Sequence, residues 1–245
     1  GQTNGTNQAD ELYIYNWTGY ADPEVYALFE ERYGIRVIED NFSSNEEALA
    51  KLQAGGTGYD IIVPSDYMVQ IMVAKGLLLP LNKENLTNIG NITDWVNQFH
   101  NGGPYYDPEL TYCIPYLYGS TGIGISSAVP NADEIDSWGY FFDPQLNASF
   151  DGRFSMLNDS REFIGAALQY LGYSRNTTNM DELTAARDLL IATSDRFYAI
   201  DSDQFEVLLL TGDTLLAQAW NGDILLAQEQ DPGITFVIPK EGGTF

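Results

Sequence analysis

The sequence predicts an α/β protein of two lobes, each a β-sheet covered by helices. Short apolar runs alternate with helical segments along the first 76 residues, the connections between them are short, and a similar alternation returns in the second half. A chain of 245 residues is long enough to form two such domains. A parallel sheet with this pattern carries its ligand crevice at the carboxyl ends of its strands.

Three strand–helix pairs make up the first half. The predicted strands are 12–15, 35–38 and 61–63, and the predicted helices follow them from 23 to 33, from 44 and from 66 to 75. The strands are short apolar or aromatic runs, which is typical of buried strands. Pro23 is placed for the first helical turn, and Gly34 and Gly76 follow the last residues of two helices.

The boundary between the lobes is predicted near residue 118. The segment 112–118 is extended and aromatic, and glycines follow it closely, so it is suited to carry the chain from one lobe to the next. We therefore expect a flexible tether at 1–11, a first lobe at 12–118 and a second lobe at 119–245. In the second lobe, strands are predicted at 154–157, 215–220 and 235–238, and helices at 161–171, 180–194 and 224–230.

The charge balance limits the possible partners. Thirty-five acidic residues against eleven basic ones give a net charge of −24. Such a field repels nucleic acid and attracts cations. The alternative explanation is a solvated acidic surface that keeps the protein soluble.

The chain has few residues for catalysis or metal binding. Cys113 is the only cysteine and stands in an apolar run, so we expect it to be a buried packing residue. A single cysteine forms no internal disulfide and no cysteine metal cluster. His100 is the only histidine, which removes most zinc sites. Residues 119–124 lack the lysine of a phosphate-binding loop. The sequence predicts no cofactor, no metal and no enzymatic activity.

No stretch is apolar and long enough to span a bilayer. The first ten residues are polar, as expected of a tether left after removal of a targeting segment, although a cloning remnant would look similar.

The informative side chains follow the predicted strands. They are Trp17, Thr18 and Tyr20 after the first strand, Ser65, Asp66 and Tyr67 after the third, Asp159 and Glu162 after the first strand of the second lobe, and Trp220 at the end of another. Gathered in one crevice, rings, hydroxyls and carboxylates suit a ligand with positive ends and an apolar middle.

Each of these side chains also has an ordinary explanation. Either tryptophan could be a core residue. Ser65 and Asp66 could cap a helix, and Asp159 and Glu162 have the spacing of a capping box.

Five segments in consistent order resemble the periplasmic spermidine/putrescine-binding proteins of ABC transporters. They are Leu-Tyr-Ile-Tyr-Asn-Trp-Thr-Gly-Tyr at 12–20, Tyr-Asp-Ile-Ile-Val-Pro-Ser-Asp-Tyr at 59–67, Leu-Gly-Tyr-Ser-Arg-Asn-Thr-Thr at 171–178, Trp-Asn-Gly at 220–222 and Pro-Lys-Glu-Gly-Gly at 239–243. The resemblance implies the type II periplasmic-binding-protein fold, with two lobes and a ligand cleft between them.

The resemblance also implies roles for individual residues. An aromatic box would be formed by Trp17, Tyr20, Tyr67 and Trp220, hydroxyl acceptors would come from Thr18, Ser65 and Ser202, and ammonium groups would be held by Asp159 and Glu162. The implied partners are a polyamine and an ABC permease. The implied protein is an exported, periplasmic or cell-surface monomer, with or without a lipid anchor.

Two departures from the family pattern bear on the ligand. Gly19 stands where the family often has an acid, and the nearby Asp66 could compensate. The family continues after Gly-Gly-x-Phe with a Trp and an Asp that contact ligand, whereas this sequence stops at Phe245. We therefore expect weak polyamine binding by the 245-residue form. Rival interpretations are a binding protein for a metal ion, sugar or other organic cation, or a hydrolase with paired acids.

Overall fold

The computed structural model describes residues 10–56, 58–92, 104–150 and 152–244. By its internal contacts the chain divides into two compact units, Gly1–Leu117 (unit 1) and Tyr118–Phe245 (unit 2). His100 and nearly all of the expected tether lie outside the described residues. Within those residues, no helix has the length and apolar character needed to cross a membrane.

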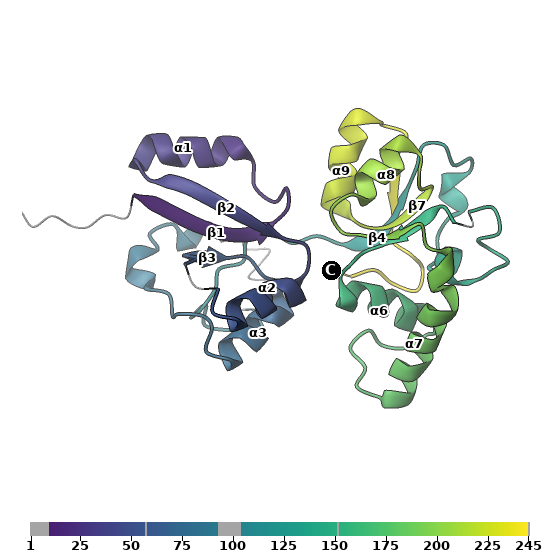
Figure 1. Cartoon of the computed structure of the whole chain (residues 1–245), viewed down its shortest axis with the longest axis horizontal. Coiled ribbons are helices and arrows are strands. Elements are labelled where there is room, and N and C mark those ends of the chain that lie inside the picture. Colours follow the sequence, from purple (N-terminus) through teal and green to yellow (C-terminus); the bar gives the residue numbers. More distant parts are fainter. Residues whose placement is uncertain (1–9, 57, 93–103, 151, 245) are drawn as a thin grey trace, which may run out of the picture. The chain divides into compact units, whose positions relative to one another are not determined.

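Unit 1 contains a three-stranded parallel sheet in the order β2-β1-β3. Its strands are β1 (Glu11–Trp17), β2 (Arg36–Phe42) and β3 (Ile61–Ile62). Its helices are α1 (Pro23–Tyr33), α2 (Asn45–Gln53) and α3 (Asp66–Ala74). Figure 1 shows α1 on one face of this sheet and α2 and α3 on the other, which is the layered α/β arrangement that the sequence predicted.

Helix caps fix where α1 begins and ends. The Asp22 carboxylate accepts a 2.8 Å hydrogen bond from the Glu24 backbone N–H, and Pro23 occupies the first helical position. Gly34 ends the helix at a φ of 68°, a left-handed conformation that glycine adopts without strain. These caps confirm the predicted bounds of the first helix.

Unit 2 contains a mixed five-stranded sheet in the order β6-β5-β7-β4-β8. Its strands are β4 (Thr121–Ile125), β5 (Phe154–Met156), β6 (Ala199–Ile200), β7 (Leu216–Trp220) and β8 (Thr235–Val237). The parallel pattern expected from the first half holds for β5 with β6 and β7, whereas β4 runs antiparallel to both β7 and β8.

The sequence did not predict β4, because its glycines do not favour a strand. Packing explains them. A Cβ atom on Gly122 would lie 2.4 Å from the Val237 carbonyl oxygen, so only glycine allows β4 and β8 to approach each other here.

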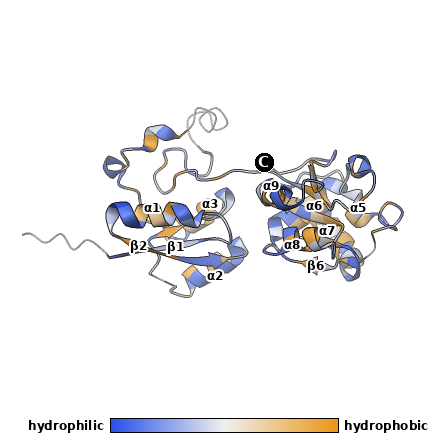
Figure 2. Cartoon of the chain, turned by 90° about the horizontal axis from the view of Figure 1, so that it is seen from above, coloured by the Kyte–Doolittle hydropathy of each residue, from blue (hydrophilic) through white to orange (hydrophobic). Residues whose placement is uncertain are grey.

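Helices cover both faces of the sheet in unit 2. They are α5 (Gly139–Phe142), α6 (Ser160–Tyr170), α7 (Met180–Thr193), α8 (Phe205–Thr211) and α9 (Asn221–Gln230). Figure 1 shows α6 and α7 on one face and α8 and α9 on the other. Leu216 packs into the core beside α6 and α7, whereas the next residue, Ala217, packs into the core beside α8 and α9. Figure 2 shows hydrophobic residues gathered inside this unit and hydrophilic residues on its outside.

Candidate functional site

Trp17 ends β1 and is largely buried, with 8% of its surface exposed. Its ring packs against Phe42, with centroids 4.6 Å apart, and lies 6.2 Å from the ring of Tyr20. The intervening Thr18 is exposed, and Gly19 takes a φ of 72° in the turn. Trp17 is thus part of the core of unit 1, as the alternative interpretation allowed, while Thr18 and Gly19 face solvent.

A carboxylate on the opposite face of the sheet supports this turn. The Glu39 side chain accepts hydrogen bonds from Asn16 Nδ2 (3.2 Å), from Asn41 Nδ2 (3.0 Å) and from the Tyr26 hydroxyl. Asn16 in turn accepts from the Trp17 N–H at 2.9 Å, and Asn41 Nδ2 also donates to the Trp17 carbonyl at 3.2 Å. Both backbone polar groups of Trp17 are therefore held by amides that Glu39 orients.

The Glu39 carboxylate is stabilised by hydrogen bonds from neutral donors. Burial, together with the hydrogen bond to Glu39, raises the pKa of Tyr26 to about 12, so this hydroxyl remains a donor at neutral pH. An ionised carboxylate only accepts hydrogen bonds, so it fixes which end of each neighbouring amide faces it.

The second loop of unit 1 lies beside the first. The register pairs Tyr15 with Ile62, so the chain leaves β1 and β3 at the same edge of the sheet. Asn45, which is fully buried, donates to both the Ser65 hydroxyl and the Tyr67 hydroxyl at 3.0 Å. Its carbonyl oxygen accepts from the Ser65 N–H at 3.0 Å. One amide thus positions two of the predicted site residues.

The capping explanation is wrong for the Ser65 side chain. Ser65 occupies the N-cap position of α3, but its side chain makes no capping hydrogen bond. Asp66 accepts from the Tyr67 N–H and from the Tyr105 hydroxyl, each at 2.6 Å.

Asp159 caps α6, as its ordinary explanation predicted. One carboxylate oxygen accepts from the backbone N–H groups of Arg161 (2.9 Å) and Glu162 (3.0 Å), and 4% of the residue is exposed. The helix N-terminus stabilises this negative charge.

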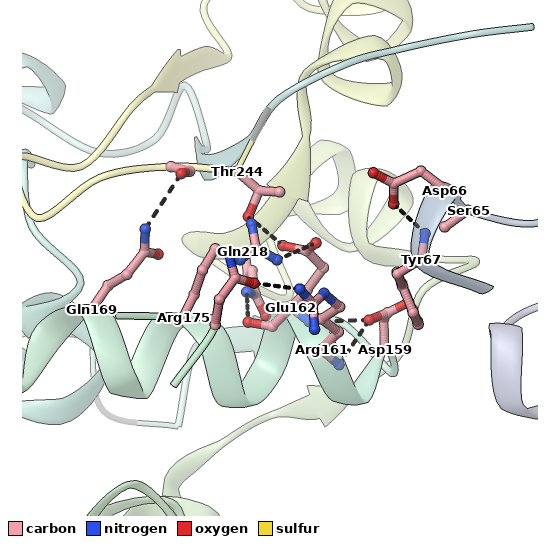
Figure 3. A network of polar contacts seen from close by, with 12 residues as sticks. Ser65, Asp66, Tyr67, Asp159, Arg161, Glu162, Gln169, Arg175, Gln218 and Thr244 are labelled. Carbon is pink, nitrogen blue, oxygen red and sulfur yellow. Dashed lines mark hydrogen bonds and ion pairs between the residues drawn. The ribbon is translucent and has the colours of Figure 1, made fainter. Parts of the chain in front are cut away.

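Glu162 does not complete a capping box. One of its carboxylate oxygens forms an ion pair with Arg175 Nη2 at 3.0 Å, and the other accepts from the Thr244 hydroxyl at 2.8 Å. The two charged side chains are 14% and 16% exposed. Figure 3 shows this network beside the first turn of α6, with Gln218 of β7 donating to the Glu162 backbone carbonyl at 2.8 Å.

The last predicted residues lie at the carboxyl ends of two strands, Ser202 after β6 and Trp220 at the end of β7. Trp220 is half-buried and packs edge-on against Phe205, with centroids 6.0 Å apart. The Ser202 hydroxyl oxygen is buried, and no hydrogen-bond partner lies within its reach in the described part of the chain. A buried hydroxyl of this kind is suited to bind a ligand group.

Two further acids lie near this strand end. Burial raises the pKa of Asp223 to about 6. The pKa of Glu206 is also raised, mainly by burial and further by the charges of Asp223, Asp201 and Asp203. Across the described residues, no three His, Cys, Asp or Glu side chains are placed to hold a metal ion.

A family model described as bacterial extracellular solute-binding protein matches residues 24–245. The chain belongs to this family. The family consists of solute-binding transport proteins and is not a class of enzymes.

Two curated relatives cover nearly all of the chain. The spermidine/putrescine-binding periplasmic protein of Escherichia coli (strain K12) is 35% identical over 236 residues, which is 96% of this chain and 65% of that protein. The putrescine-binding periplasmic protein PotF of the same strain is 32% identical over 253 residues, or 97% of this chain and 68% of that protein. The chain thus spans about two thirds of the length of these relatives.

A solved structure supports the fold. It is named for a spermidine/putrescine ABC transporter from Listeria monocytogenes, is 33% identical and superposes with a TM-score of 0.86 over 96% of this chain and 70% of that one. The α/β fold of a type II periplasmic binding protein, expected from the sequence, is confirmed.

Several site-forming residues escaped the sequence analysis. Asn45 and Glu39 had no distinguishing motif, because their importance arises from contacts with residues distant in the sequence. Asp223 had a usable signal, since it stands three residues after Trp220, at the start of a predicted helix. Cys113 is partly buried, and burial raises the pKa of its thiol to about 12, in keeping with a packing role.

Proposed function

We propose that this solute-binding protein captures a polyamine and delivers it to an ABC importer. The observation that carries the proposal is the 35% identity, over 96% of the chain, to a protein named for binding spermidine and putrescine.

The side chains of each unit suit a slender cation. In unit 1, the rings of Tyr20 and Tyr67 and the hydroxyls of Thr18 and Ser65 would contact methylene and ammonium groups, next to the largely buried Trp17. In unit 2, we assign contacts to Trp220, Ser202, Asp159 and Asp223. Asp66 would contribute negative charge from the first turn of α3.

The interactions that a polyamine would make with these side chains have comparable free energies. A carboxylate ~4 Å from an ammonium gains roughly 4 kcal/mol at an effective dielectric of about 20, before desolvation is subtracted. A cation over an aromatic face adds about 0.5–2 kcal/mol, and each buried methylene about 0.8 kcal/mol. Charge pairing and apolar burial are thus both needed, which is why a site with rings alone or acids alone would not select a polyamine.

We also propose that the protein is exported, to the periplasm or the cell surface, and that it works as a monomer and engages a membrane permease. The E. coli relatives are named as periplasmic proteins. Ligand contacts made only in a closed form would favour that form, which the permease would then recognise.

Nuclear magnetic resonance with residue-specific tryptophan signals tests the proposal. Putrescine and spermidine, added up to millimolar concentration, should shift the indole signals of Trp17 and Trp220. Trp138 serves as the internal control, because it is 1% exposed and its indole N–H is bonded to the Gly242 carbonyl at 3.0 Å. Shifts caused by a sugar or by Ca²⁺, with none from either polyamine, would refute the proposed ligand class.

A further inference from the structure

A partly buried ion pair engages Glu162, one of the carboxylates expected to bind the ligand. Arg175, in the loop after α6, reaches back to Glu162 at 3.0 Å and also donates to the Thr244 hydroxyl. Thr244 donates to the second Glu162 oxygen at 2.8 Å. Both oxygens of the Glu162 carboxylate are therefore engaged within the protein, as Figure 3 shows.

The positive charge in this pair is permanent. An arginine guanidinium stays charged in a protein, so Arg175 places a positive charge beside Glu162. A partly buried carboxylate that is already paired gains little from a second cation. Removing only one partner, however, leaves a partly buried charge that favours a new counter-ion.

The Arg175–Glu162 pair lies at the end of the sheet where β7 finishes with Trp220. Thr121 is paired with Trp220 on one side and forms a bridge with Thr244 on the other. Neighbouring strands are ~4.8 Å apart, so Thr244 lies about 10 Å from Trp220 across β4. Glu162 is bonded to the Thr244 side chain, and Gln218 holds its backbone to β7. The state of the Glu162 charge therefore affects the electrostatics of this end of the sheet.

We propose that Arg175 is a specificity-determining residue that withholds Glu162 from the ligand, so that the site selects a diamine over a triamine. This inference rests on the proposed polyamine function. The distinction is one of charge number, because spermidine brings a third ammonium centre that needs its own counter-charge, whereas putrescine brings two. With Glu162 paired to Arg175, one carboxylate fewer is available to pair with a third cationic centre.

Three variants test the assignment through the ratio of spermidine to putrescine affinity, measured by competition calorimetry. Arg175→Gln should free the Glu162 charge and shift the ratio about tenfold toward spermidine. Arg187→Gln is the matched control, because it removes the same charge from a solvent-exposed pair with Asp188 on α7 (63% and 60% exposed) and should shift the ratio less than about twofold.

The double variant Glu162→Gln with Arg175→Gln guards against a folding defect, because it replaces the pair by two neutral side chains of similar shape. Its ratio should match that of the unmodified protein. An unchanged ratio in Arg175→Gln would overturn the proposal, and so would a loss of spermidine affinity in the double variant, which would mean that Glu162 binds the ligand directly. If the unmodified protein binds neither amine, the proposed function fails as well. If it binds both and the ratios do not move, only the role of Arg175 fails.

Discussion

Asp223→Asn should stabilise the ligand-free protein in a pH-dependent way. Asp223 lies in the first turn of α9, and burial raises its pKa from 3.8 to about 6. The difference of roughly two pKa units corresponds to about 3 kcal/mol, since each unit is worth 1.36 kcal/mol. The side chain is partly solvated, so we expect about 1–3 kcal/mol.

The sign follows from linkage. A raised carboxyl pKa means that the folded protein holds the proton more tightly than the unfolded chain does. Stability from this group is therefore fully present below about pH 4, falls as the pH rises, and is lost above about pH 6. Asparagine resembles the protonated acid, so the variant should match the unmodified protein at low pH and exceed its stability at neutral pH.

Urea unfolding, followed by far-ultraviolet circular dichroism between about pH 4 and pH 8, measures this difference. Asp133→Asn is the control, because it removes the same negative charge from an exposed position in unit 2. A stability difference that stays constant with pH, or that appears equally in the control, would refute the argument. The substitution should also weaken polyamine binding, since an ammonium group relieves the cost of the buried charge.

Three further predictions concern side chains that the structure places next to the loops. Glu39→Gln should speed hydrogen exchange at the Trp17 amide and weaken polyamine binding about tenfold, whereas Glu31→Gln, an equal charge change on the exposed surface of α1, should do neither. Asn45→Ala should cost about 2–3 kcal/mol in urea unfolding, because buried groups lose their partners. Ser202→Ala should leave the melting temperature unchanged and lower only ligand affinity; a large drop in melting temperature would assign Ser202 a structural role.

Local patterns in the sequence were sufficient for much of the fold. The cap at Asp22 with Pro23, and the apolar runs that became β1 and β7, depend on residues close together in the chain, so they could be predicted. β4 could not, because its Gly122 is required by the approach of β8, more than a hundred residues away. The expected capping by Asp159 is confirmed, since a cap is also a local feature.

For the candidate site, too, some features follow from local sequence and others only from tertiary contacts. Its residue types and their places after the strands were set by the sequence itself, since strand ends are recognisable from local hydrophobicity. The tertiary structure decided which charged side chains are paired within the protein and which are available to a ligand. Arg175 neutralises Glu162 from thirteen residues further along, and Glu39 orients the Trp17 turn from a neighbouring strand. Electrostatic energy depends on distance and burial, and both are fixed only when the chain folds.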